Sequence, residues 1–191
     1  MLEAELITAC IRNDKSARKQ FFEMFYGKFS FIALRYCKSQ EQADDFILKA
    51  FQGVFSALPK FNHQSNFKLE PFVKFEFIAS LINEIKNIRQ EYYVASTVRA
   101  TDKKENSYDL FIDNLSIDLA SINKEILIEA LHELAPAQRL VFNLLVIDGY
   151  SLSLISDLLD SNEQTINSNL EKARFSLQKK IEKNLKLRQH E

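Results

Sequence analysis

The sequence predicts an all-α protein made of two small helical domains joined by a linker, the C-terminal one a helix-turn-helix. The chain has 191 residues but only three glycines and three prolines, so few positions oppose helix formation. Apolar residues recur at intervals of three and four over most of the chain, which is the spacing of one helix face. This periodicity fades between residues 94 and 122, where acidic, serine and asparagine residues accumulate. We therefore expect domains at 1–93 and 123–191, with an acidic linker at 94–122.

The N-terminal domain is expected to contain four amphipathic helices. The second helix carries phenylalanines on its apolar face, at Phe21, Phe25 and Phe29. Pro59 ends the third helix, and Pro71 suits the first turn of the fourth, where a missing N–H costs no helical hydrogen bond. The expected segments are helices at 2–10, 16–36 and 40–58, a polar turn at 62–66, and a helix from residue 71 to about residue 93.

The C-terminal domain is expected to begin with helices at 124–134 and 136–148. Two shorter helices follow, separated by a polar turn at 160–162, where Ser161 or Asn162 is placed to cap the second helix. This is the layout of a DNA-binding helix-turn-helix, in which early residues of the second helix enter the major groove. An ordinary helical hairpin has the same pattern. The apolar positions around the turn are Leu154, Ile155, Leu158, Leu159, Ile166, Leu170 and Ala173.

Charge is distributed unevenly along the chain, although the formal net charge is only −1. Between residues 102 and 133, three lysines stand against eight acidic residues, a net charge of −5. Between residues 161 and 191, seven lysines and arginines stand against four glutamates, a net charge of +3. The basic end therefore coincides with the second helix of the helix-turn-helix and its extension, where cations would neutralise phosphates. A solvated helix face would also be charged.

Several classes of function are not expected. Cys10 and Cys37 are isolated thiols and the histidines are scattered, so the sequence predicts no metal site, disulfide framework or cofactor. Neither a glycine-rich phosphate loop nor a catalytic constellation is visible, so we do not expect an enzyme. The apolar runs are short and the N-terminus lacks the basic region of a signal peptide, so we expect a cytoplasmic protein without direct membrane insertion.

Residues 42–51 carry two adjacent carboxylates, Asp44 and Asp45, on the edge of a helix whose other face is apolar. This segment resembles the acidic helix "D-A-E-D-x-x-Q-x-x-F" of the extracytoplasmic-function (ECF) sigma factors of bacterial RNA polymerase. The resemblance implies that Asp44, Asp45 and Leu48 belong to a surface that binds the clamp of core RNA polymerase, with Leu48 where the family has Gln. By charge alone, the carboxylates suit a basic partner surface, but a solvated helix edge would look the same.

The C-terminal domain resembles the same family from residue 134 to residue 174. Residues 134–142 are similar to the opening "L-P-x-x-x-R-x-V-F", with the proline displaced by one position, and residues 148–151 to the turn "E-G-x-S". Residues 165–174 are similar to "T-V-K-S-R-L-x-R-A-R", with Asn167 and Asn169 at two positions that are basic in the family. Asparagine can still read adenine edges, but each lost cation removes a phosphate contact.

The resemblance implies that both domains bind promoter DNA. The C-terminal domain would bind the upstream element as double-stranded DNA, and the fourth helix would capture the melted non-template strand with basic and aromatic side chains. The family's Trp is absent, Gln90 stands at a usual Arg, and for most of the phenylalanines core packing is the simpler interpretation. The candidates are Gln164, Thr165, Asn167, Ser168, Asn169, Lys172 and Arg174 in the C-terminal domain, and Lys74, Asn83, Lys86, Asn87 and Arg89, with the aromatic residues Phe67, Phe72, Phe75, Phe77, Tyr92 and Tyr93, around the fourth helix.

Together these features predict a non-enzymatic RNA polymerase sigma factor that directs promoter-specific transcription initiation. Its expected partners are core RNA polymerase, promoter DNA and an anti-sigma factor. One alternative is a sigma-like interaction module or decoy that has lost productive DNA binding, which Asn167 and Asn169 favour because they replace basic residues. A second alternative is a response-regulator output protein, which is disfavoured because the N-terminal half lacks the alternating strands of a receiver domain.

Overall fold

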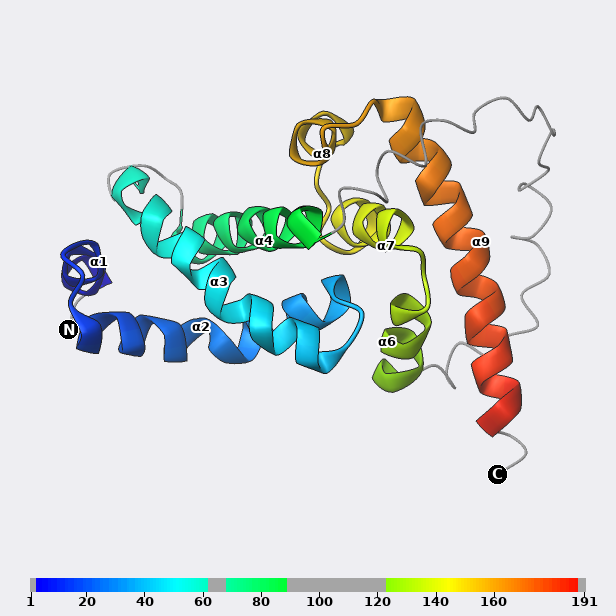
Figure 1. Ribbon diagram of the computed structural model, residues 1–191, viewed down its shortest axis with the longest axis horizontal. Helices are drawn as coiled ribbons and strands as arrows, with labels where there is room; N and C mark the ends of the chain where they lie inside the picture. The colour runs from blue at the N-terminus through cyan, green and yellow to red at the C-terminus, as the bar shows by residue number, and fades with distance from the viewer. Residues whose placement is uncertain (1–2, 62–67, 89–122, 189–191) are drawn as a thin grey trace. The chain divides into compact units, whose positions relative to one another are not determined.

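The computed structural model describes residues 3–61, 68–88 and 123–188, and these residues form helices without any strand (Figure 1). The all-α prediction is therefore confirmed. The chain divides into two compact units, Met1–Ile88 and Arg89–Glu191. The linker predicted at 94–122 and the polar turn predicted at 62–66 lie outside the described residues. No helix in the described ranges is long and apolar enough to cross a membrane.

The described part of the N-terminal unit consists of α1 (Glu3–Ile11), α2 (Lys15–Tyr36), α3 (Gln40–Ala57) and α4 (Leu69–Ile88). A 3₁₀ turn at Leu58–Lys60 contains the proline that was expected to end α3. Side-chain caps fix two of the helix starts. A carboxylate oxygen of Asp14 accepts from the N–H of Ala17 at 2.8 Å, and Oγ of Ser39 accepts from the N–H of Gln42 at 3.2 Å. Such caps satisfy backbone donors that have no partner within the helix.

Phenylalanines from α2, α3 and α4 form the centre of the core of this unit. Phe29, Phe51 and Phe77 are buried. Their ring centroids are 4.8 Å apart for Phe29 and Phe77, 5.4 Å for Phe51 and Phe77, and 5.9 Å for Phe29 and Phe51. Inclined ring contacts at these distances add to the stabilisation that burial provides. Core packing is therefore confirmed as the interpretation of Phe77.

The described part of the C-terminal unit consists of α6 (Lys124–His132), α7 (Pro136–Phe142), α8 (Leu152–Leu159) and α9 (Glu163–Arg188). The 26 residues of α9, orange to red in Figure 1, combine the second helix of the helix-turn-helix with the basic extension in one continuous helix. It packs against α6, α7 and α8. The core of this unit includes Ile126, Leu131, Leu140, Leu144, Ile155, Leu159, Ile166 and Ala173.

The prediction of one α-helix over 136–148 is wrong at its C-terminal end. After α7, residues Asn143–Ile147 form a π-helical turn, in which the N–H of Asp148 donates to the carbonyl of Asn143, five residues earlier, at 2.8 Å. Because a π turn is wider than an α turn, the residues at its end face a different direction from those of a continued α-helix. The last two residues of this turn are 47% and 40% exposed.

Candidate nucleic-acid interface

Short-range hydrogen bonds hold the turn between α8 and α9. Oγ of Ser156 donates to the carbonyl of Ser161 at 2.5 Å, and the N–H of Ser161 donates to the carbonyl of Ser156 at 3.1 Å. Of the two predicted caps, Asn162 is the one used, because its Oδ1 accepts from the N–H of Thr165 at 2.8 Å. The prediction of two helices joined by a tight polar turn is therefore confirmed.

Asp160 ends α8 in the left-handed backbone conformation, with φ 50° and ψ 50°. Glycine adopts this conformation without a steric penalty, and Asp is among the few other residues that visit it. Asp160 therefore holds a backbone conformation that glycine would adopt at lower cost.

The first turns of α9 are buried on one side and exposed on the other. Ile166, Leu170 and Ala173 are buried, and their spacing of four and three places them on one face. The opposite face carries the polar side chains that a bound duplex would meet in a helix-turn-helix complex. Of the predicted DNA-binding residues in this unit, Gln164, Asn167, Ser168, Lys172 and Arg174 are exposed, whereas Thr165 and Asn169 are half-buried.

Asn167 and Asn169 lie on different flanks of α9. Successive residues of an α-helix differ in direction by about 100°, so residues two apart point nearly opposite ways. The side-chain amide of Asn169 donates to the carbonyl of Thr165 at 3.0 Å, which ties it to its own helix. The structure therefore brings Gln164, Asn167 and Ser168 together on the exposed side and separates Asn169 from them.

Glu171 also lies on the exposed side of α9, although comparison with the family's basic positions did not single it out. It follows Gln164 by seven residues and Ser168 by three, so the three side chains share one face. An oxygen of Glu171 accepts from Nη1 of Arg174 at 3.0 Å, and these side chains are 45% and 53% exposed, respectively. Glu171 could have been identified from the sequence, because residues seven positions apart in a helix share one face and Glu171 follows Gln164 at that interval.

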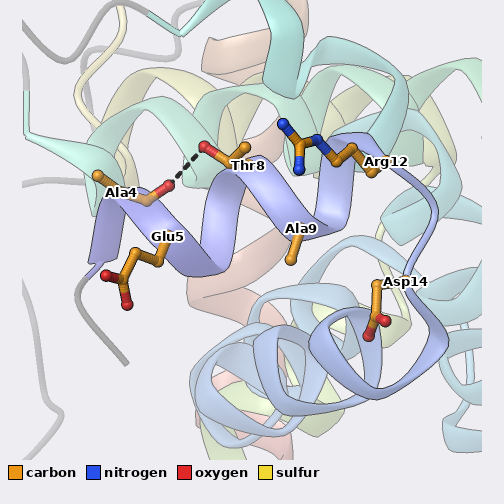
Figure 2. A pocket seen from close by; sticks show the side chains of 6 residues that line it. All are labelled: Ala4, Glu5, Thr8, Ala9, Arg12 and Asp14. Carbon is orange, nitrogen blue, oxygen red and sulfur yellow. Dashed lines mark hydrogen bonds between the residues drawn. The ribbon is translucent and has the colours of Figure 1, made fainter.

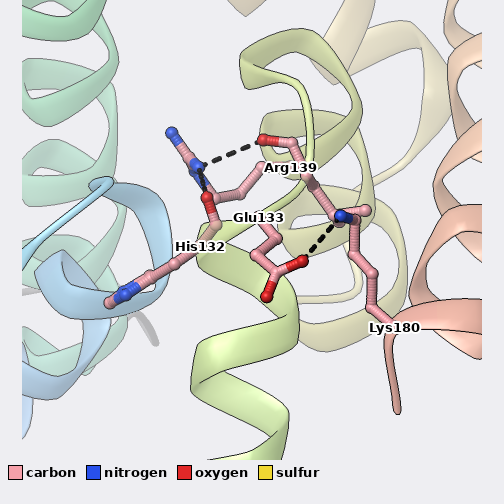
Figure 3. A network of polar contacts seen from close by, with 5 residues as sticks. His132, Glu133, Arg139 and Lys180 are labelled. Carbon is pink, nitrogen blue, oxygen red and sulfur yellow. Dashed lines mark hydrogen bonds and ion pairs between the residues drawn. The ribbon is translucent and has the colours of Figure 1, made fainter. Parts of the chain in front are cut away.

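Arg139 holds the junction between α6 and α7 from inside the unit. It is buried, and its Nη1 donates to the carbonyls of His132 at 3.0 Å and Leu134 at 3.3 Å (Figure 3). Nearby, Nζ of Lys180 pairs with Oε2 of Glu133 at 2.8 Å. The two hydrogen bonds from Arg139 satisfy carbonyls at the end of α6, and the ion pair between Lys180 and Glu133 joins that end to α9. Arg139, the arginine of the motif at residues 134–142, therefore supports the helices against which α9 packs.

The exposed side of α3 carries the residues predicted for polymerase binding. Asp44, Asp45 and Leu48 are all exposed, Leu48 to 61%. The adjacent cation, Lys49, pairs with Glu84 of α4 at 3.6 Å, so its charge is directed toward α4. The part of α3 around Leu48 consequently combines negative charge with an exposed apolar side chain.

The predicted DNA-binding residues of α4 fall on two sides of the helix. Helical spacing places Phe72, Phe75, Asn83 and Lys86 along one side, where each is exposed or half-buried. Lys74 is half-buried. Around the helix axis it lies more than 90° from those four residues, on the side nearer the core. Of the remaining candidates, Asn87 is exposed, Phe77 is buried, and Phe67, Arg89, Tyr92 and Tyr93 lie outside the described residues.

A hollow lies beside α1 (Figure 2). Oγ1 of Thr8 there donates to the carbonyl of Ala4 at 2.8 Å, and the charged groups are of both signs. The hollow is lined by Ala4, Glu5, Thr8, Ala9, Arg12 and Asp14.

Among the residues that the structure describes, no group of three or more His, Cys, Asp or Glu side chains is arranged to hold a metal ion.

Two comparisons relate the chain to known proteins. Residues 124–177 match the family model of sigma-70, region 4. The fold is similar to that of the sigma factor RpoE from Bartonella quintana, solved in complex with the anti-sigma factor NepR; the TM-score is 0.54, the sequence identity is 19%, and the match covers 86% of this chain and 96% of that chain. No curated protein matches the chain by sequence.

The C-terminal unit therefore contains a sigma-70 region 4 domain, and the chain has the fold of a sigma factor. The matched segment begins at the first residue of α6 and ends within α9, so it includes the whole helix-turn-helix. The resemblance to the ECF sigma factors, which the sequence motifs predict, is confirmed by these two findings.

Proposed function

We propose that the protein is an RNA polymerase sigma factor that directs promoter-specific transcription initiation. The proposal rests on the region 4 match over residues 124–177, because the matched segment contains a helix-turn-helix whose second helix presents an exposed polar side. A sigma factor is not an enzyme. It acts by binding core polymerase and promoter DNA, and neither role requires a cofactor.

In this proposal the C-terminal unit binds the upstream promoter element as double-stranded DNA. Gln164, Asn167 and Ser168 face the base edges, where a side-chain amide can form two hydrogen bonds with adenine. Lys172 and Arg174 lie nearer the sugar-phosphate backbone, which cations bind whatever the sequence. Base contacts would then determine which promoter sequence is bound, and the cations would supply affinity that depends on the salt concentration.

The N-terminal unit would bind core polymerase through α3 and the melted non-template strand through α4. Asp44 and Asp45 supply acceptors for basic side chains of the polymerase, and Leu48 adds an apolar contact. On α4, Phe75 offers a ring for stacking and Asn83 a hydrogen-bonding amide, in line with how proteins hold single strands. These roles are supported by the exposure of the residues on one side of each helix.

An anti-sigma factor is proposed as the regulatory partner, with the cytoplasm as the compartment of action. The support is that RpoE of Bartonella quintana, which is similar in fold, was solved bound to the anti-sigma factor NepR. If the anti-sigma factor covers a surface that polymerase or DNA needs, the two modes of binding will exclude each other. Competition between the anti-sigma factor and core polymerase for the purified protein would measure this.

A second candidate function is a decoy that binds polymerase without reading DNA. It is favoured by the charge of the first part of α9, where Glu163 and Glu171 balance Lys172 and Arg174. Neutralisation of phosphates supplies a large share of protein–DNA affinity. A recognition helix without net positive charge would therefore bind DNA weakly.

Transcription in vitro tests both candidates, with the purified full-length protein, cognate core RNA polymerase and genomic DNA fragments. Transcripts that start at defined sites only when the protein is added would support the sigma factor. Inhibition of a second sigma factor, without transcripts of its own, would support the decoy. A protein that does not bind core polymerase would contradict both.

The variant Asp45→Lys tests the proposed polymerase surface. Substitution of an exposed helical residue should leave the fold intact, while reversal of its charge should weaken association with core polymerase. Glu23→Lys in α2 is a matched control, because Glu23 is also an exposed helical acid and forms a surface ion pair with Lys19 at 3.8 Å. Equal polymerase binding by the two variants would exclude α3 as the docking surface.

A further inference from the structure

Glu171 is the only acidic residue of α9 between Gln164 and Arg174. It lies on the exposed side of the helix, on the same face as Gln164 and Ser168. Nearly half of its side-chain surface is exposed, and its carboxylate accepts from Nη1 of Arg174 at 3.0 Å. In a helix-turn-helix complex this face of the second helix lies in the major groove.

The ion pair between Glu171 and Arg174 gives little reason for an acid at this position on grounds of stability. Both side chains are about half exposed, and pairs of this kind contribute little in water. A neutral residue at position 171 would therefore leave the fold of the unit nearly unchanged. The reason for an acid at this position is therefore sought in its contacts with DNA.

A carboxylate in the major groove is close to phosphates of its own sign, and it can only accept hydrogen bonds. The groove offers it two kinds of donor, the N4 amino group of cytosine and the N6 amino group of adenine. Acidic side chains pair with cytosine N4, whereas adenine is bound bidentately by the amides of Asn and Gln. Gln164 and Asn167 already supply such amides on α9, so the carboxylate suits the cytosine.

We propose that Glu171 is a specificity-determining residue that accepts a hydrogen bond from the N4 amino group of a cytosine in the upstream promoter element. This inference rests on the proposed function of α9. Arg174 stays on the same carboxylate, partly neutralises it beside the phosphates and restricts its rotamer. Where the base pair presents no donor, the carboxylate forms no hydrogen bond with the base and binding weakens. Glu171 therefore narrows the range of bound sequences more than it raises affinity.

The test uses the full-length protein in complex with core RNA polymerase, and a library of double-stranded oligonucleotides with a randomised upstream element. Glu171→Ala should reduce a preference for C·G at one position by about tenfold, the equivalent of one good base contact. It should also tighten binding to the disfavoured sequences. Glu182→Ala is the matched control, because Glu182 is on the same helix, accepts from Gln178 at 3.3 Å and lies well beyond the turns that enter the groove.

Three results would overturn the inference. The first is a wild-type preference that survives unchanged in Glu171→Ala, which leaves the proposed function standing. The second is recovery of the C·G preference in the double variant Glu171→Ala, Arg174→Ala, because Glu171 would then act by restraining Arg174 and not by touching the base. The third is a wild-type complex that selects no upstream sequence, which removes base reading by α9 and the inference with it.

Discussion

Gly53 of α3 lies directly against Ser80 of α4. A Cβ atom placed on Gly53 would fall 2.7 Å from Cβ of Ser80, much closer than the separation at which carbon atoms attract each other. A glycine inside a helix is otherwise unfavourable by about 0.5–1 kcal/mol relative to alanine. The close approach of the two helices therefore explains Gly53, and it fixes the spacing between the helix proposed to bind polymerase and the helix proposed to bind the melted strand.

Gly53→Ala should lower the free energy of unfolding of the N-terminal unit by about 1–3 kcal/mol, because the added methyl group overpacks the contact between α3 and α4. Urea denaturation followed by circular dichroism would measure the change. Adding Ser80→Gly should recover part of the loss, since it removes the Cβ that the methyl group meets. Wild-type stability in Gly53→Ala would contradict the close approach.

Gly27 supplies the matched control, because it also lies inside a helix, α2, but a Cβ there would meet no atom within 4 Å. Gly27→Ala should raise the free energy of unfolding by about 0.5–1 kcal/mol, since alanine loses less backbone entropy on folding. Opposite signs for the two substitutions would separate helix packing from helix propensity.

Asp160 provides a second test, in the turn of the helix-turn-helix. Asp160→Val should destabilise the C-terminal unit by about 1–2 kcal/mol, because the left-handed conformation is costly for a residue with a Cβ and more so for a branched one. Asp160→Gly should be at least as stable as wild type. Asp157→Val, at an exposed helical position of α8, is the control and should change stability by about 0.5 kcal/mol or less. Equal loss in the two valine variants, measured by thermal denaturation, would show that backbone conformation is not the cause.

Local chemistry made several helix ends and the helix-turn-helix predictable from the sequence. Proline after α3 and an asparagine before α9 act within a turn of their own positions, and the structure uses both. The buried face of α9 follows from the spacing of Ile166, Leu170 and Ala173. Such signals depend on neighbours along the chain, so one sequence is enough to read them.

Features that depend on hydrogen-bond register or on a second helix were not predictable in the same way. The π turn after α7 forms because the N–H of Asp148 donates to the carbonyl of Asn143, five residues earlier. The apolar pattern of the sequence does not show whether a backbone N–H donates to the carbonyl four or five residues earlier. The contact of Gly53 with Ser80 requires the crossing of two helices. For Asn169, comparison with the family indicated DNA contact, whereas the structure shows its amide bound to Thr165.

The thiol of Cys10 gives a prediction about pH. Burial raises its pKa above the ordinary value, Arg18 opposes this shift and Asp14 adds to it. Because the folded pKa is the higher one, the unfolded chain releases the proton first as the pH rises. The stability associated with this group is therefore complete below the pKa of the unfolded thiol and is lost as the pH rises through the folded value.

We accordingly expect the free energy of unfolding to decline in alkaline solution, and Cys10→Ala to reduce that decline. Both cysteines are buried, so a thiol reagent at mildly alkaline pH should label the native protein slowly and the urea-unfolded protein fast. Rapid labelling of both thiols in the native protein would contradict the burial of Cys10 and Cys37.

The exposed side of α9 gives the last prediction, since here the sequence departs most from the family that it resembles. If α9 reads DNA, Asn167→Ala should cost about 1–3 kcal/mol of binding free energy at one base position. Asn169→Ala should cost less, because the amide of Asn169 is held by Thr165 on the other flank. Lys172→Ala should weaken binding to all sequences alike and lower the salt-dependence slope by about one. The measurement is titration of the polymerase complex with promoter duplexes at two salt concentrations. If none of the three variants changes affinity or selectivity, α9 does not read DNA and the decoy function is the better description.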